Sequence, residues 1–155
     1  MNVDNGIVNS DWCQSESIET ATLSTSMDRR TIQFHDNNLY MPRDNGTTLE
    51  IFNIVSKATR TKTISNIYCS TSQKSGNNLY IPQNNGTTLV IFDLSTESSR
   101  TKTIANMYRY TSYAGNGNLY MPQYNGTTLE IFNLISESTR AIALPTNMQR
   151  RICYY

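Results

Sequence analysis

NLYMPQYNGTTLEIFNL, at residues 118–134, is the stretch that decides the fold, because the chain contains three versions of it. NLYIPQNNGTTLVIFDL occupies residues 78–94, and NLYMPRDNGTTLEIFNI occupies residues 38–54. The three copies follow one another at a constant spacing of 40 residues. A fixed period of this length is typical of repeat architectures. The fold is therefore expected to be one structural unit built several times.

Each copy contains segments that are typical of short β-strands. The segment TTLEIFNL, at 127–134, is rich in Thr, Ile, Leu and Phe, and turn residues bound it. A type I′ turn needs positive φ at both central residues, and Asn-Gly accepts this conformation at least cost. The sequence therefore predicts a type I′ hairpin between the second and third strands, with Asn-Gly as its turn at 45–46, 85–86 and 125–126.

A first and a fourth strand complete the unit. In the third copy the first strand is MYRYTSYAG at 107–115, and the fourth is STRAIAL at 138–144. The fourth segment of the second copy, SRTKTI at 99–104, alternates polar and basic residues, which suits an exposed sheet edge. The predicted unit is thus a four-stranded antiparallel sheet with an apolar middle and a polar rim.

The fold class is therefore all-β, and four strands per repeat fit either a β-propeller or a β-trefoil. A trefoil is complete with three copies, but here the remaining residues are themselves repeat-like. NMQRRICYY, at 147–155, aligns with the first strand of the third copy, and SIETATL, at 17–23, falls on a fourth strand. A β-propeller of about four blades is favoured, with the trefoil as the alternative. The single domain, 1–155, then divides into 1–26 (partial repeat), 27–66, 67–106 and 107–146 (repeats), and 147–155 (partial repeat closing with the N-terminus).

The order of these motifs resembles the kelch repeat and the related YVTN repeat of β-propellers. Kelch-type repeats place an Arg at the start of the first strand, a Tyr in the second and an Asp at the end of the third. The corresponding residues here are Arg29, Arg109, Tyr40, Tyr80, Tyr120 and Asp93. The chain departs from the kelch pattern in two ways. It lacks the double glycine after the second strand, and Arg60, Arg100 and Arg140 replace the tryptophan near the fourth strand.

Composition excludes several classes of function. Lys and Arg number 13 against 12 Asp and Glu, and this balance provides no basic surface for nucleic acid. No window reaches the ~20 apolar residues of a membrane span, and the N-terminus does not read as a secretory signal. Three cysteines without metal-ligand spacing, Cys13, Cys69 and Cys153, indicate free thiols in a reducing compartment. We therefore expect a cytoplasmic protein with no nucleic-acid or membrane partner.

No catalytic or metal-binding constellation is visible in the sequence. His35 is the only histidine and is expected to be a solvated turn residue. Carboxylates such as Glu50, Glu97 and Glu130 are expected on exposed strand faces or loops. No nucleophile pairs with a base by motif, and a metal site would lack imidazole ligands. We expect no enzyme, no cofactor and no metal.

The first strands differ among the copies, and in propellers the first strand lines the central channel. Alignment places Arg29, Arg109 and Arg150 at one level of this channel, with Tyr110 beside them. Arginine forks match phosphate or carboxylate, so these four residues are the candidate ligand-binding site. The predicted function is a non-enzymatic interaction module that binds a protein or small anionic partner through its loops and channel mouth.

The alternative function is a carbohydrate-binding propeller whose Asn-Gly-Thr turns supply repeated pockets. Stacking of sugars on Tyr40, Tyr80 and Tyr120 is less favoured than packing of these rings between blades. The closing copy lacks most of its second strand, and unpaired strand edges invite association. The sequence therefore predicts either a homodimer that forms a larger ring or a gapped four-blade monomer of low stability.

Overall fold

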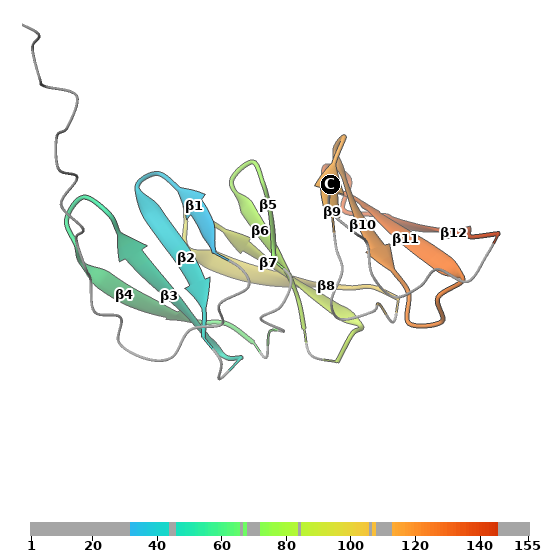
Figure 1. Cartoon of the computed structure of the whole chain (residues 1–155), viewed down its shortest axis with the longest axis horizontal. Coiled ribbons are helices and arrows are strands. Elements are labelled where there is room, and N and C mark those ends of the chain that lie inside the picture. The colour runs from blue at the N-terminus through green and yellow to red at the C-terminus, as the bar shows by residue number, and fades with distance from the viewer. Residues whose placement is uncertain are drawn as a thin grey trace, which may run out of the picture.

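The computed structural model describes residues 32–43, 46–65, 67, 72–83, 85–105, 107 and 113–145, which form three four-stranded antiparallel sheets. Each sheet is one blade, and the blades stand side by side along the chain (Figure 1). Blade 1 contains β1 (Gln33–His35), β2 (Asn38–Pro42), β3 (Thr48–Asn53) and β4 (Thr59–Thr63). Blade 2 contains β5 (Gln73–Ser75), β6 (Asn78–Pro82), β7 (Thr88–Asp93) and β8 (Ser98–Thr103). Blade 3 contains β9 (Tyr113–Gly115), β10 (Asn118–Pro122), β11 (Thr128–Asn133) and β12 (Thr139–Ala143).

The all-β, blade-by-blade architecture confirms the predicted β-propeller and excludes the β-trefoil alternative. In the described part of the chain, every strand pairs only with its sequence neighbours in its own blade. The outer strands β4, β8 and β12 are largely exposed, as the polar sequences of β4 and β8 predict. The partial repeats at 1–26 and 147–155 lie outside the described residues, as do all three cysteines, so the predicted closure of the ring stays a prediction.

Strand register gives each blade two different faces. Tyr40 pairs with Ile51 and Ile51 with Arg60, so these three side chains form one row on one face of the sheet. Leu39 pairs with Phe52, and this pair lies on the opposite face. We call the first the leading face, because it meets the next blade along the chain, and the second the trailing face.

The core lies between the leading face of one blade and the trailing face of the next. At the first junction the leading face supplies Tyr40, Leu49, Ile51, Ile64 and Ile67, and the trailing face supplies Leu79, Ile81, Val90, Phe92 and Leu94. The second junction repeats this with Tyr80, Leu89, Ile91, Ile104 and Met107 against Leu119, Met121 and Phe132. The tyrosine rings meet the phenylalanines of the next blade with centroids 6.2 Å and 6.1 Å apart. The expectation that Tyr40 and Tyr80 pack between blades is confirmed.

The Asn-Gly connections at 85–86 and 125–126 are not type I′ turns, which corrects the prediction for these two, whereas Asn45 lies outside the described residues. Gly86 has φ 74° and Gly126 has φ 73°, but Asn85 and Asn125 do not have positive φ. The Asn125 side chain instead accepts hydrogen bonds from the backbone N–H groups of Thr127 and Thr128 at 3.0 and 3.1 Å. The asparagine stabilises the turn through the hydrogen bonds of its side-chain amide, and only the glycine adopts the left-handed conformation. Both central residues have positive φ in the turns between the first two strands of blades 1 and 3, at Asp36 and Asn37 and at Asn116 and Gly117.

A carboxylate holds the turn between β7 and β8. Asp93 Oδ1 accepts hydrogen bonds from Ser95 Oγ at 2.6 Å, from the Ser95 N–H at 2.8 Å and from the Thr96 N–H at 3.0 Å. These bonds, that from the Ser95 hydroxyl above all, lower the pKa of Asp93 to about 2. Asn53 and Asn133 accept the equivalent bonds in blades 1 and 3. An uncharged amide therefore fits the same turn.

The packing between blades predicts that truncation of a leucine destabilises the fold more where that leucine is more deeply buried. Leu89 is fully buried at the second junction, whereas Leu129, its counterpart on blade 3, is only half-buried. Leu89→Ala should lower the free energy of unfolding by about 2–5 kcal/mol, and Leu129→Ala should cost clearly less, because a less enclosed site leaves less of a cavity. Urea unfolding of both variants at low protein concentration measures this difference. Equal costs would contradict the assignment of Leu129 to an open face.

The Asp93 turn predicts an acid dependence of stability. The folded pKa is about 2 and the ordinary value is 3.8, so the stabilisation from this carboxylate is present above about pH 4 and is lost as the pH falls toward 2. Asp93→Asn should retain the turn and lose less stability than the wild type between pH 5 and pH 2, in urea unfolding. Asn53→Asp, the reverse change in blade 1, should steepen the loss. Identical pH profiles for all three proteins would refute the role of Asp93.

Candidate functional site

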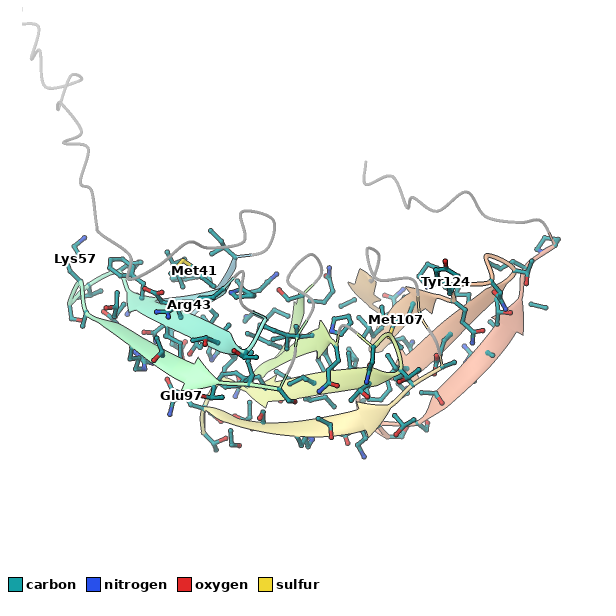
Figure 2. All side chains as sticks on the ribbon, turned by 90° about the horizontal axis from the view of Figure 1, so that it is seen from below. Met41, Arg43, Lys57, Glu97, Met107 and Tyr124 are labelled. Atoms are coloured by element: carbon teal, nitrogen blue, oxygen red, sulfur yellow. The ribbon has the colours of Figure 1, made fainter. Side chains whose placement is uncertain are left out.

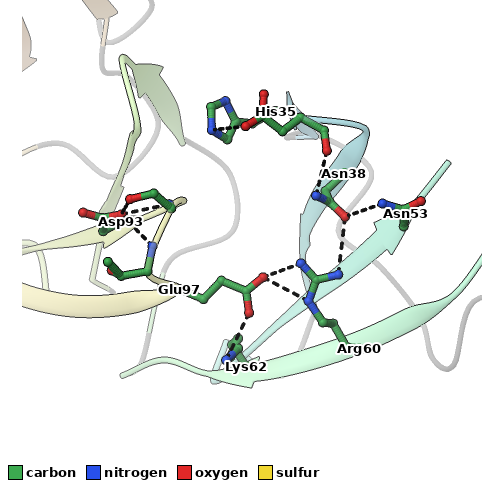
Figure 3. A network of polar contacts seen from close by, with 10 residues as sticks. His35, Asn38, Asn53, Arg60, Lys62, Asp93 and Glu97 are labelled. Atoms are coloured by element: carbon green, nitrogen blue, oxygen red, sulfur yellow. Dashed lines mark hydrogen bonds and ion pairs between the residues drawn. The ribbon is translucent and has the colours of Figure 1, made fainter. Parts of the chain in front are cut away.

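A carboxylate from each following blade binds a pair of cations on the leading face of the blade before it. At the first junction Arg60 donates from Nε to Glu97 Oε1 at 3.0 Å, its terminal nitrogen contacts the same oxygen, and Lys62 Nζ lies 3.0 Å from Glu97 Oε2 (Figure 3). Arg60 also donates to Asn38 Oδ1 at 3.3 Å. We call this arrangement of asparagine, arginine and lysine the carboxylate socket.

The second junction repeats the arginine and lysine contacts of the socket, but Asn78 Oδ1, the counterpart of Asn38 Oδ1, accepts no hydrogen bond there from a described residue. Arg100 donates from Nε to Glu137 Oε1 at 3.1 Å, and Lys102 Nζ lies 2.8 Å from Glu137 Oε2. The hydrogen bond from the arginine lowers the pKa of the glutamate in both sockets, with the lysine contributing in the same direction. Both carboxylates are therefore held ionised. The arrangement fits one carboxylate, because the guanidinium group contacts one of its oxygens and the ammonium group contacts the other.

The glutamate of each socket stands at a backbone position that disfavours an L-residue. Glu97 has φ 51° and Glu137 has φ 52°, in the corners between the third and fourth strands of their blades. The left-handed region costs a non-glycine residue on the order of 1 kcal/mol. Asparagine or glycine fits such a corner better, and the glutamates that stand there contact the arginine and lysine of the preceding blade. Lys57 occupies the equivalent corner of blade 1, with φ 61°.

The individual ion pairs are weak because they are partly solvated. The Arg60 side chain is 42% exposed and that of Glu97 is 19% exposed. Exposed pairs of this kind contribute roughly 0–1 kcal/mol each, and salt screens them. The sockets therefore add little to stability beside the apolar core. Their main effect is on specificity, because they favour an acidic corner in contact with the preceding blade and disfavour a basic one.

Blade 3 carries a third socket that no described residue fills. A pocket of about 340 Å³ lies on its leading face, lined by Asn118, Ile131, Asn133, Ser136, Ser138, Thr139 and Arg140. Asn118 and Arg140 are the counterparts of Asn38 and Arg60. Among the described residues, no acidic side chain pairs with Arg140. Ile142 replaces the lysine and is 40% exposed.

The residues that the sequence singled out for ligand binding lie outside the described residues. Arg29, Arg109, Tyr110 and Arg150 all fall there, so their convergence at a channel mouth stays a prediction. Innermost strands do approach one another where the structure describes them, since Gln33 Nε2 of blade 1 donates to the backbone oxygen of Ser72 at 3.1 Å.

The expected solvent exposure of His35, Glu50 and Glu130 is wrong. His35 ends strand β1 with its side chain only 15% exposed, and its Nε2 lies 3.4 Å from Asp36 Oδ2, so it is not a solvated turn residue. Glu50 and Glu130 are buried rather than exposed. Arg43 Nε donates a hydrogen bond to Glu50 Oε2 at 3.0 Å, and the Ala105 N–H donates one to Glu130 Oε2 at 2.7 Å. Burial raises the pKa of Glu130.

The described part of the chain contains neither a metal-ligand cluster nor a membrane-spanning helix. Within it, no three His, Cys, Asp or Glu side chains cluster closely enough to hold a metal ion. The same residues include no helix long and apolar enough to cross a membrane. The amides of Asn85 and Asn125, considered for sugar pockets, hydrogen-bond within their own turns.

Sequence reasoning missed the carboxylate sockets, although a signal for them exists. Each pair joins residues 37 positions apart, Arg60 with Glu97 and Arg100 with Glu137. The recurrence of Arg-Thr-Lys in the fourth strand, with Glu in the next corner, could have indicated the contact. The pattern of a single outer strand predicts only solvent-exposed charges, so it does not indicate the contact.

The likeness to solved structures supports the propeller fold and no finer relationship. No protein-family profile matches this sequence, and no curated protein matches it. The N-terminal domain of Nup159 aligns at a TM-score of 0.57 and 17% identity, over 75% of this chain and 31% of that one. Hsv2 of Kluyveromyces lactis aligns at 0.57 and 14%, over 77% and 39%. AztD of Citrobacter koseri aligns at 0.55 and 7%, over 79% and 34%. The chain spans about a third of the length of these proteins, and like them it is built of β-propeller blades.

Proposed function

We propose that this chain is a non-enzymatic β-propeller module that binds a protein partner. One observation carries the proposal: the leading face of blade 3 repeats the surface that blades 1 and 2 bury against a neighbour, but no described sheet covers it. Leu49 and Leu89 are fully buried at this position, whereas Leu129 is half-buried beside the exposed Ile142. Incomplete burial of an interface-like apolar face is typical of a binding surface.

The comparison with Nup159 supports a protein partner. A structure of S. cerevisiae Dbp5 bound to Nup159, with Gle1, IP6 and ADP, aligns with this chain at a TM-score of 0.57 and 16% identity, over 75% of this chain and 30% of that one. The binding seen there belongs to Nup159, and fold alone does not transfer function. A kelch-like or YVTN-like repeat and a cytoplasmic location are part of the proposal. A second copy of this chain, as the incomplete closing repeat predicts, is one candidate partner.

The proposal predicts that a charge on the leading face of blade 3 abolishes partner binding. Leu129→Arg places a cation within the half-buried apolar surface, and the desolvation cost should reduce partner capture more than tenfold. Thr61→Arg, on the exposed strand β4, is the matched control and should leave capture unchanged. Candidate partners are captured on immobilised wild-type chain and then tested as purified proteins by calorimetry. A partner retained by Leu129→Arg would show that this face is not the binding surface.

The anionic part of the proposed function rests on Arg29, Arg109, Arg150 and Tyr110. If three arginines converge at the channel mouth, a hexaglutamate peptide should bind and Arg109→Ala should abolish that binding. The melting temperature should stay within a few degrees, because the side chain would be used for the ligand and not for the core. Calorimetric titration and thermal unfolding measure the two effects. Loss of stability with unchanged peptide affinity would assign these arginines to the scaffold.

A further inference from the structure

The unfilled third socket is defined by comparison with two filled copies in the same molecule. In the filled sockets a corner glutamate of the next blade meets an arginine that stands in the Tyr–Ile–Arg row of the leading face. Blade 3 has the same row, because Tyr120 pairs with Ile131 and Ile131 with Arg140. Its pocket is lined by Asn118 and Arg140, the counterparts of Asn38 and Arg60 in the first socket.

We propose that the Arg140 pocket is a docking site for a glutamate side chain at the corner of a further β-blade, which a protein partner supplies. This inference rests on the proposed protein-binding function and names the chemistry of the partner. Charge complementarity supports it, since each arginine in this row that has a described blade beyond it holds a carboxylate. Continuity supports it too, since the pocket adjoins the half-buried Leu129 of the apolar face.

Blade 1 of a second copy does not match this socket. Its corner carries Lys57 at the position of Glu97 and Glu137, and Figure 2 shows Lys57 at the outer end of the array, while Glu97 lies between blades 1 and 2. Direct stacking of that blade on blade 3 would bring Lys57 toward Arg140. Opposed like charges disfavour such a contact. The acidic corner is therefore expected from a different partner.

The test uses the full chain and a disulfide-closed hairpin peptide that carries residues 128–143, with Glu137 at its corner. This is the segment that fills the socket of blade 2. The hairpin should bind the wild type, and Arg140→Ala should weaken binding roughly two- to fivefold, the range expected for a partly exposed ion pair. Ile142→Lys restores the second cation of the filled sockets and should strengthen binding. A peptide with Glu137→Lys should not bind.

Titration calorimetry at low and high salt measures these affinities, and thermal unfolding confirms that each variant is folded. Arg100→Ala is the matched control, since its socket is already occupied by Glu137 within the chain. Equal affinity for the glutamate and lysine peptides, or no binding even by Ile142→Lys, would overturn the proposal. Self-association of the wild type that Arg140→Ala abolishes would assign the socket to a second copy instead. If the socket fails while Leu129→Arg still prevents partner capture, the proposed function stands without it.

Discussion

Packing of one sheet face against the next is the interaction on which the rest of the structure depends. A four-stranded sheet with apolar residues on both faces cannot cover either face by itself. Each repeat therefore places a Tyr–Ile row on its leading face and a Leu–Phe pair on its trailing face, and the two surfaces meet at each junction. Because the faces differ, the array has a direction and two unlike ends. One end is the leading face of blade 3.

The charged residues at each junction determine which blades can pack against each other. A buried leucine or isoleucine contributes roughly 1.5–3 kcal/mol, and each junction contains several of them. An ion pair as exposed as Arg60–Glu97 contributes at most about 1 kcal/mol. The apolar faces would accept many blades with comparable gain, but a wrong corner sets like charges against each other. Apolar area thus supplies the affinity between blades, and the socket restricts which blade fits.

The repeat, the strand type and the packing of Tyr40 and Tyr80 could be predicted from sequence, because they follow from period and residue type. The conformation of the turn at Asn125 could not be predicted. The side chain of Asn125 accepts a hydrogen bond from a backbone N–H group of the turn, and only the following glycine has positive φ. The Arg60–Glu97 contact joins different repeats, and pattern reading within one repeat does not reveal it. The sequence predicts His35 in a turn, but the turn consists of only two residues, Asp36 and Asn37, so His35 is the last residue of strand β1. Arg29, Arg109, Arg150 and Tyr110 remain predictions.

The first and last described blades differ from the middle blade at the socket positions while retaining the apolar pattern. Blade 1 has Lys57 in place of a corner glutamate, and blade 3 has Ile142 in place of the second cation. Fully complementary faces at the two ends of a directional array would let copies add head to tail, and such an interface forms open filaments unless its rotation closes a ring. A lysine corner at one end and an arginine socket at the other oppose that addition. They leave the socket complementary to an acidic corner, which blades 2 and 3 carry and blade 1 lacks.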